Sequence, residues 1–163
     1  MASELDEIDV RLLDELQRDA DRSNVDLARA VGLSPTATLH RVRRLKSSGL
    51  IAAIAARLDP GTAGFPLRVY VQLTVARHTE ATEQRLNDVI RGLPQVTQAD
   101  WVAGETDALL TVAARNLEEL QQVLLALSSR GGATRVTTLL RLSEIKPPSA
   151  LPLEPSPRRA RSR

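Results

Sequence analysis

Four basic side chains lie close together in the first third of the chain: Arg41, Arg43, Arg44 and Lys46. A guanidinium group can donate paired hydrogen bonds to a phosphate or to O6 and N7 of guanine, and a lysine ammonium suits a phosphate. Residues 27–57 hold six basic and no acidic residues, whereas residues 1–26 hold three arginines and nine acidic residues. Positive charge is thus concentrated around this cluster, as the binding of a nucleic acid requires.

The segment Gly104-Glu105-Thr106-Asp107 could carry a different chemistry, the binding of a free amino acid. The Asp107 carboxylate can receive an α-ammonium group, and backbone N–H groups of a glycine-containing turn can receive a carboxylate. The alternative is an ordinary hairpin turn, in which glycine and aspartate are common residues. The residues alone favour the ordinary turn.

The composition excludes several classes of site. The chain has no cysteine, which excludes disulfides and thiolate ligands, and its two histidines cannot form a metal site by themselves. His40 has no accompanying nucleophile, which favours contact with DNA or solvent over catalysis. We therefore predict no catalytic residue, metal or cofactor. No apolar run approaches the roughly 18 residues of a membrane helix and no secretory signal is visible, so we expect a cytoplasmic, nucleoid-associated protein without membrane contact.

Helical periodicity places the basic cluster on the third of three predicted helices. The expected elements are helices over about Glu7–Asp19, Asn24–Val31 and Pro35–Ser48 and a following strand over Leu50–Leu58. Ser23 and Ser34 are typical helix N-caps, and Gly32 separates the second helix from the third. Two short helices joined by a glycine-containing turn predict a helix-turn-helix, which places its second helix in the DNA major groove.

The third helix has an inward stripe, formed by Thr38, Val42 and Leu45, and residues off this stripe can face DNA. We predict that the side chains that face base edges are those of Thr36, Leu39, His40 and Arg43. Arg44 and Lys46 are expected at phosphates, whereas Arg41 fits a phosphate contact or an internal ion pair as well as it fits base reading. The predicted DNA-binding residues are Ser34, Thr36, Leu39, His40, Arg41, Arg43, Arg44 and Lys46.

From Leu67 the apolar period changes to that of strands. Strands and helices are predicted in the order βαββαβ, at about 68–75, 79–91, 96–103, 108–114, 116–128 and 134–143. This order is that of the ferredoxin-like fold, so we predict an α+β protein. The expected domains are a helix-turn-helix domain at 1–58, a linker at 59–66, a ferredoxin-like domain at 67–146 and a largely disordered Pro- and Arg-rich tail at 147–163.

Several short motifs are spaced along the chain between Leu5 and Leu153. They are Leu5-Asp6, Val31-Gly-Leu-Ser-Pro35, Arg41-Val-Arg-Arg-Leu45, Gly49-Leu-Ile51, Leu58-Asp-Pro60, Gly104-Glu-Thr-Asp107 and Glu144-Ile-Lys146. Together these motifs resemble the Lrp/AsnC family of transcription regulators. The resemblance implies a winged or extended helix-turn-helix, a ferredoxin-like effector and assembly domain, dimers that assemble further, commonly into octamers, and a small effector that is usually an amino acid.

The resemblance also favours effector binding at the turn after the second strand of the ferredoxin-like half. The residues that it implies there are Trp101, Gly104, Thr106, Asp107, Thr138 and Leu139. Trp101 fits a core anchor as well as it fits a wall of the effector pocket. Members of the family usually have an aromatic residue where this chain has Ala108, and the space left there favours a larger or aromatic effector side chain.

We predict a sequence-specific transcription regulator whose partners are double-stranded DNA, an amino-acid effector and further copies of the chain, as a homodimer that assembles into an octamer. The apolar side of the first strand of the ferredoxin-like half, at Val69, Val71, Leu73 and Val75, is expected to need a partner to cover it. The alternative is a nucleoid-architecture protein that bends DNA with little sequence specificity. An enzyme or small-molecule carrier is disfavoured, because no His/Glu cluster and no phosphate-binding glycine loop is present.

Overall fold

The computed structural model describes residues 5–76 and 78–155. The chain forms two compact units, divided between Ala56 and Arg57 and again between Glu144 and Ile145. Unit 1 combines the N-terminal segment with the C-terminal segment, and unit 2 is the segment between them. None of the helices within the described ranges has the length and apolar character that crossing a membrane requires.

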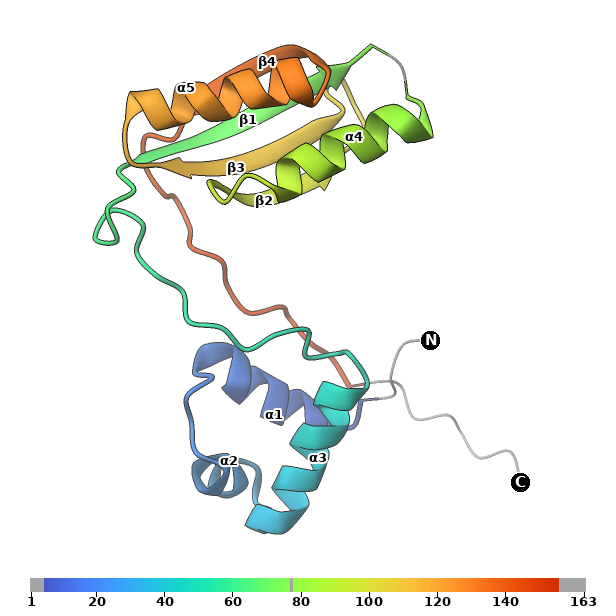
Figure 1. Ribbon diagram of the computed structural model, residues 1–163. Coiled ribbons are helices and arrows are strands. Elements are labelled where there is room, and N and C mark those ends of the chain that lie inside the picture. Colours follow the sequence, from blue (N-terminus) through green and yellow to red (C-terminus); the bar gives the residue numbers. More distant parts are fainter. Residues whose placement is uncertain (1–4, 77, 156–163) are drawn as a thin grey trace. The chain divides into compact units, whose positions relative to one another are not determined.

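Unit 1 contains three helices (Figure 1), α1 (Glu7–Arg18), α2 (Asn24–Val31) and α3 (Pro35–Ser47). The side chain of the N-cap residue accepts a backbone N–H bond at the start of each helix; the N-caps are Asp6 for α1, Ser23 for α2 and Ser34 for α3. Aliphatic side chains from all three helices form one small core, consisting of Leu12, Leu27, Val31 and Val42. The three predicted helices are confirmed to within one residue at their ends.

Polar contacts fix the turn between α2 and α3. Gly32 ends α2 with a φ of 71°, a left-handed conformation that glycine adopts without a steric penalty. The Asn24 side chain donates a 2.7 Å hydrogen bond to the Pro35 carbonyl oxygen, which ties the start of α2 to the start of α3. Arg11 of α1 donates a 2.6 Å hydrogen bond to the carbonyl oxygen of Ala30 in α2. These bonds hold the three helices as one unit.

The predicted strand at Leu50–Leu58 is wrong, because the structure assigns no strand there. A strand requires a neighbouring strand to complete its hydrogen-bond ladder, and the one sheet of the described chain contains only strands of unit 2. The apolar residues of this segment are accordingly exposed: Ile54 by 48% and Leu58 by 71%. The described part of unit 1 is therefore a helix-turn-helix without a wing strand.

Unit 2 is a four-stranded antiparallel sheet with both helices on one face (Figure 1). Its elements are β1 (Leu67–Val75), α4 (Glu80–Arg91), β2 (Val96–Trp101), β3 (Ala108–Ala114), α5 (Leu117–Leu125), the π-helical turn η1 (Ala126–Arg130) and β4 (Ala133–Leu140). The spatial strand order β2-β3-β1-β4 confirms the predicted ferredoxin-like βαββαβ unit.

The expectation about the apolar side of β1 is wrong. Val69, Val71, Leu73 and Val75 are at most 5% exposed, because they pack in a core with Leu86 of α4 and with residues of α5 and η1. The chain's own helices therefore cover this side, and it needs no second copy. The alternation of polar and apolar residues along β1 indicates that one side of the strand is buried, but it does not indicate which element covers that side.

The first part of the C-terminal segment has no helix or strand between residues 147 and 155, but it makes specific contacts within unit 1. Gln17 of α1 binds the Leu151 backbone twice: its amide nitrogen donates to the carbonyl oxygen at 3.3 Å, and its amide oxygen accepts the N–H at 2.7 Å. Leu151 and Leu153 also line a hollow with Leu13 and Leu16. The remainder of the predicted disordered tail, 156–163, lies outside the described residues.

Candidate nucleic-acid interface and effector region

Helix α3 has the buried stripe that its sequence predicts. Thr38, Val42 and Leu45 are 0%, 8% and 1% exposed. The Thr38 hydroxyl donates a 3.0 Å hydrogen bond to the carbonyl oxygen of Ser34, so this buried polar group is satisfied. The orientation of α3 about its axis is therefore fixed by packing, and its opposite side faces solvent.

Six of the eight predicted DNA-binding residues are exposed and make no ion pair within the described ranges: Ser34, Thr36, Leu39, His40, Arg43 and Lys46. Ser34 is also the N-cap of α3, since its hydroxyl accepts the Ala37 N–H at 3.2 Å. Arg43 and Lys46 present positive charge that no acidic side chain of the described chain neutralises. This surface can bind phosphates and base edges.

Arg41 and Arg44 are instead brought to acidic side chains of α1 and its N-cap. Arg41 donates to Asp6 Oδ2 at 2.6 Å and to Asp9 Oδ1 at 2.9 Å, and Arg44 donates to Asp9 Oδ2. The internal pair is thus the arrangement found for Arg41, and the predicted phosphate contact Arg44 is engaged in the same network. The hydrogen bonds that Arg41 donates to the carboxylates of Asp6 and Asp9, that to Asp6 first, raise the pKa of Arg41 above its usual value.

Asp9, which the sequence interpretation assigned to no site, pairs with both arginines. It is 1% exposed, although aspartate is almost never buried without a partner. A signal was present, because Asp9 falls among the apolar positions Val10, Leu12 and Leu13 that form the buried side of α1. An acid on the apolar face of a helix indicates an internal cation, and the arginines of α3 supply it.

The segment between β2 and β3 is a hairpin turn tied to the end of β1. Gly104 has a φ of 145°, a conformation that favours glycine. The Asp107 N–H and the Thr106 hydroxyl both donate to the Leu73 carbonyl oxygen, each at 2.9 Å. The Asp107 carboxylate accepts the Val75 N–H at 2.7 Å and lies 3.0 Å from Nε2 of His78. Thr106 and Asp107 therefore have a structural role in holding this turn.

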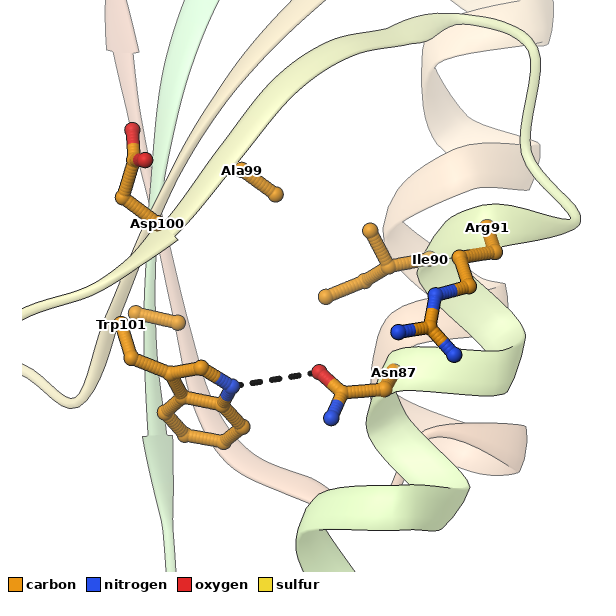
Figure 2. A pocket seen from close by; sticks show the side chains of 7 residues that line it. Asn87, Ile90, Arg91, Ala99, Asp100 and Trp101 are labelled. Atoms are coloured by element: carbon orange, nitrogen blue, oxygen red, sulfur yellow. Dashed lines mark hydrogen bonds between the residues drawn. The ribbon is translucent and has the colours of Figure 1, made fainter. Parts of the chain in front are cut away.

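Trp101 is not a core residue, because it is 41% exposed. Figure 2 shows its indole beside α4, where Nε1 donates a 3.1 Å hydrogen bond to Oδ1 of Asn87. The indole lines a cavity of about 190 Å³ together with Ile90, Arg91 and Ala108. In Figure 2 the Asp100 side chain points away from this cavity. Of the two interpretations of Trp101, the wall of a pocket is the one that fits this exposure.

The remaining predicted effector residues do not gather at one point within unit 2. Thr138 pairs with Val71 and Leu139 with Tyr70, and neighbouring residues of a strand point to opposite faces. Thr138 therefore lies on the helix-covered face and Leu139 on the open face. The lining of the Trp101 cavity includes neither of them, nor Asp107.

Two family models match the chain, and together they cover most of it. The AsnC-type helix-turn-helix domain matches residues 5–46, and the Lrp/AsnC ligand binding domain matches residues 68–151. The first match covers α1, α2 and all but the last residue of α3. The second begins at the second residue of β1, covers the rest of unit 2 and continues to Leu151, which contacts Gln17.

Curated proteins and solved structures agree with these models. A leucine-responsive regulatory protein of Haemophilus influenzae is 34% identical over 92% of this chain and 91% of its own length. That of Escherichia coli K12 is 36% identical over 74% of each chain. Among solved structures, a transcriptional regulator of Neisseria meningitidis in complex with L-methionine superposes with a TM-score of 0.84, at 29% identity over 91% of this chain and 96% of that one. An AsnC-family regulator from Agrobacterium tumefaciens gives 0.82 at 26% identity, covering 91% and 97%.

Proposed function

The chain belongs to the Lrp/AsnC family of transcription regulators, and from this premise we propose that the solvent-facing side of α3 is its DNA-reading surface. Family membership makes the chain a DNA-binding transcription regulator with a ligand-binding domain, rather than an enzyme. The observation that supports the assignment to α3 is the division of this helix. Its buried stripe is neutral, and its solvent-facing side carries positive charge at Arg43 and Lys46, which make no ion pair with any residue that the structure describes.

Each side chain on this surface has a role that follows from its chemistry. Arg43 and His40 contact base edges, Leu39 and Thr36 contact bases through apolar or hydroxyl groups, and Lys46 binds a phosphate. Ser34 caps the helix at the end that approaches the DNA and leaves its N-terminal N–H groups near a phosphate. Arg41 and Arg44 have a lesser part in this surface, because carboxylates of unit 1 already engage them.

We also propose that unit 2 binds a small effector, an amino acid, that changes assembly and DNA binding. The Neisseria meningitidis relative was solved with L-methionine, and this chain matches the ligand-binding model over nearly all of unit 2. Asp107 is the proposed receptor of the α-ammonium group, because a carboxylate has lone pairs beyond those that face Val75 and His78. Trp101 and Ala108 are proposed to set side-chain selectivity, and Gly104, Thr106, Thr138 and Leu139 to complete the site in an assembly.

Assembly is proposed to use the open face of the sheet. Tyr70 and Leu139 lie opposite each other on that face and are 38% and 46% exposed, although both are large and apolar. A dimer formed there brings two α3 helices to two half-sites, and a higher assembly, an octamer, multiplies these contacts. We further propose that the protein acts in the cytoplasm, associated with the nucleoid.

Calorimetry with the twenty amino acids tests the effector proposal on wild type, Asp107→Ala and Glu105→Ala. Glu105 is the matched control, because it is an exposed acid in the same turn with no ion pair in the described chain. We expect one group of amino acids to bind wild type and Glu105→Ala, and none to bind Asp107→Ala, while thermal unfolding shows that all three proteins are folded. If no amino acid binds wild type at millimolar concentration, or if Asp107→Ala binds equally well, the effector proposal is wrong.

Footprinting on the promoters that the protein occupies in cells separates regulation from DNA architecture. A sequence-specific regulator protects discrete sites spaced by whole helical turns. Uniform protection across unrelated sequences would support the architectural alternative instead.

A further inference from the structure

A buried carboxylate lies directly beneath the DNA-reading helix. Asp9 belongs to the first turn of α1, where the helix dipole favours a negative charge. Its side chain is 1% exposed, and no buried polar side-chain atom of the described chain lacks a hydrogen-bond partner. A carboxylate in such a place is strongly destabilising unless cations and hydrogen bonds satisfy both of its oxygens.

Two guanidinium groups of α3 satisfy those oxygens. Arg41 Nη1 lies 2.9 Å from Asp9 Oδ1, and Arg44 Nη2 donates to Asp9 Oδ2. Asp6 Oδ2 accepts a further hydrogen bond from Arg41 at 2.6 Å. Asp6 and Asp9 are themselves joined as a capping box, in which Asp9 N–H donates to Asp6 Oδ1 at 2.8 Å. The four side chains thus form one network between the start of α1 and the middle of α3, which we call the acidic clamp.

The acidic clamp divides the basic residues of α3 into two classes. Arg41 and Arg44 are held by carboxylates, whereas Arg43 and Lys46 have no ion pair in the described part of the chain. Arg41 is the more enclosed of the held pair, with a side chain 29% exposed against 55% for Arg44. A cation that is already neutralised adds little to the release of counterions from DNA, so the two classes contribute unequally to binding.

We propose that Asp9 is a positioning residue for DNA recognition, which holds Arg41 and Arg44 away from the phosphates and fixes α3 so that Arg43 and Lys46 carry the contact. This proposal rests on α3 being the DNA-reading helix. Withholding two arginines reduces the sequence-independent part of the affinity, since that part grows with the number of phosphates neutralised. Sequence discrimination is the ratio of specific to non-specific affinity, so the acidic clamp raises discrimination while it lowers total affinity.

The first test compares full-length wild type with Asp9→Asn and Glu7→Gln. Glu7 is the matched control, because it lies in the same turn of α1, is exposed and holds no arginine in the described chain, so both variants remove one negative charge. Each protein is titrated, as a function of salt concentration, with the duplex that wild type enriches from a random library and with a scrambled duplex of equal composition. For Asp9→Asn we expect a salt slope steeper by about 0.9 to 1.8, since each added phosphate contact contributes about 0.9.

Discrimination between the two duplexes is expected to fall at least roughly tenfold in Asp9→Asn, because non-specific affinity rises most. Glu7→Gln should leave the salt slope and the discrimination close to wild type. Equal slopes and equal discrimination for Asp9→Asn and Glu7→Gln would overturn the proposal.

A second pair of variants tests the proposal without altering Asp9, in case Asp9→Asn does not fold. Arg44→Gln should leave the salt slope unchanged, whereas Lys46→Gln should make it shallower by about 0.9. If Arg44→Gln and Lys46→Gln lower the slope equally, Arg44 binds a phosphate and the acidic clamp does not withhold it. If neither Lys46→Gln nor Arg43→Ala weakens binding, the assignment of α3 as the DNA-reading helix fails instead, so the two failures are distinguishable.

Discussion

In unit 2 a sheet and its two helices enclose a purely aliphatic core, whereas in unit 1 a smaller aliphatic core lies beside a buried carboxylate that holds two arginines. Among the described residues, fifteen apolar residues of unit 2 are buried, against eight of unit 1. Apolar packing supports the rigid sheet in unit 2. In unit 1 packing buries the inner side of α3, and the acidic clamp adds directional hydrogen bonds between α3 and the start of α1.

The stability of the two units should therefore depend differently on ionic strength and pH. Burial of apolar area is insensitive to ionic strength and pH over the physiological range, whereas ion pairs depend on both. A buried ion pair often contributes little net stability, but removing one partner leaves an unpaired charge. Mutations in the core of unit 2 should therefore change mainly stability, whereas mutations at the acidic clamp should change DNA recognition as well as stability.

The largest effect is expected for Leu110→Ala in the centre of β3. Leu110 is fully buried, and truncating a buried leucine lowers the free energy of unfolding by about 2–5 kcal/mol. Leu117→Ala is the control, because Leu117 is 73% exposed in the first turn of α5. Urea unfolding of the full chain measures both. If the free energy of unfolding fell by similar amounts in the two variants, Leu110 would not lie in the core of unit 2.

A somewhat smaller effect is expected for Gly131→Ala, after η1. A Cβ atom at this position would lie 2.5 Å from the Leu127 carbonyl oxygen and 2.8 Å from Cδ1 of Leu86. Overpacking of this kind lowers the free energy of unfolding by about 1–3 kcal/mol. At Gly61 the added Cβ would meet only Asp59 Oδ1, at 3.4 Å, so Gly61→Ala should change the melting temperature little. A Gly131→Ala protein as stable as Gly61→Ala would contradict this close packing.

Most of the fold could be predicted from the sequence because its signals are local. The capping residues Asp6, Ser23 and Ser34 mark helix starts, and strand alternation from Leu67 gave the order of unit 2. The unpaired segment 50–58 could not be recognised, since whether an extended segment becomes a strand depends on a partner elsewhere.

The same limit applies to the candidate site. The buried stripe and the exposed side of α3 follow from its own periodicity and could be predicted. The pairing of Arg44 with Asp9 joins residues 35 positions apart, and no local pattern specifies which acid meets which arginine. The covering of Val69 and Val71 by α4 and α5 depends likewise on which face of the sheet the helices occupy.

A smaller and local effect is expected for Gln17→Ala, which removes both hydrogen bonds to the Leu151 backbone. The cost should be about 0.5–1.5 kcal/mol, because both partners can bind water instead. Limited proteolysis should then cleave the chain faster near Leu151, while Gln121→Ala, an exposed glutamine of α5, should leave the cleavage rate unchanged. An unchanged cleavage rate in Gln17→Ala would mean that Gln17 does not hold this segment.

The smallest effect is a dependence on acid at Asp6. Burial alone would raise the pKa of Asp6, but the Asp9 N–H and the Arg41 guanidinium outweigh it, so the pKa lies below the usual 3.8. The unfolded chain therefore binds a proton more readily, and this contribution to stability is present above the usual pKa and lost as the pH falls through the lowered one. Asp6→Asn should flatten the fall in melting temperature below about pH 4. An identical acid profile for Asp6→Asn and wild type would contradict the linkage.

The claim that α3 recognises DNA bases is tested most directly by the sequence preference of the Arg43→Ala variant. This preference is measured by enrichment from a library of random duplexes, without added amino acid. Arg91→Ala is the control, because it removes an exposed arginine of unit 2 with the same change in net charge. The account predicts that Arg43→Ala weakens binding to the preferred sequence by about 1–3 kcal/mol and loses the base preference at one position of each half-site, while Arg91→Ala keeps both. An Arg43→Ala protein that selects the wild-type sequence with wild-type affinity would contradict it.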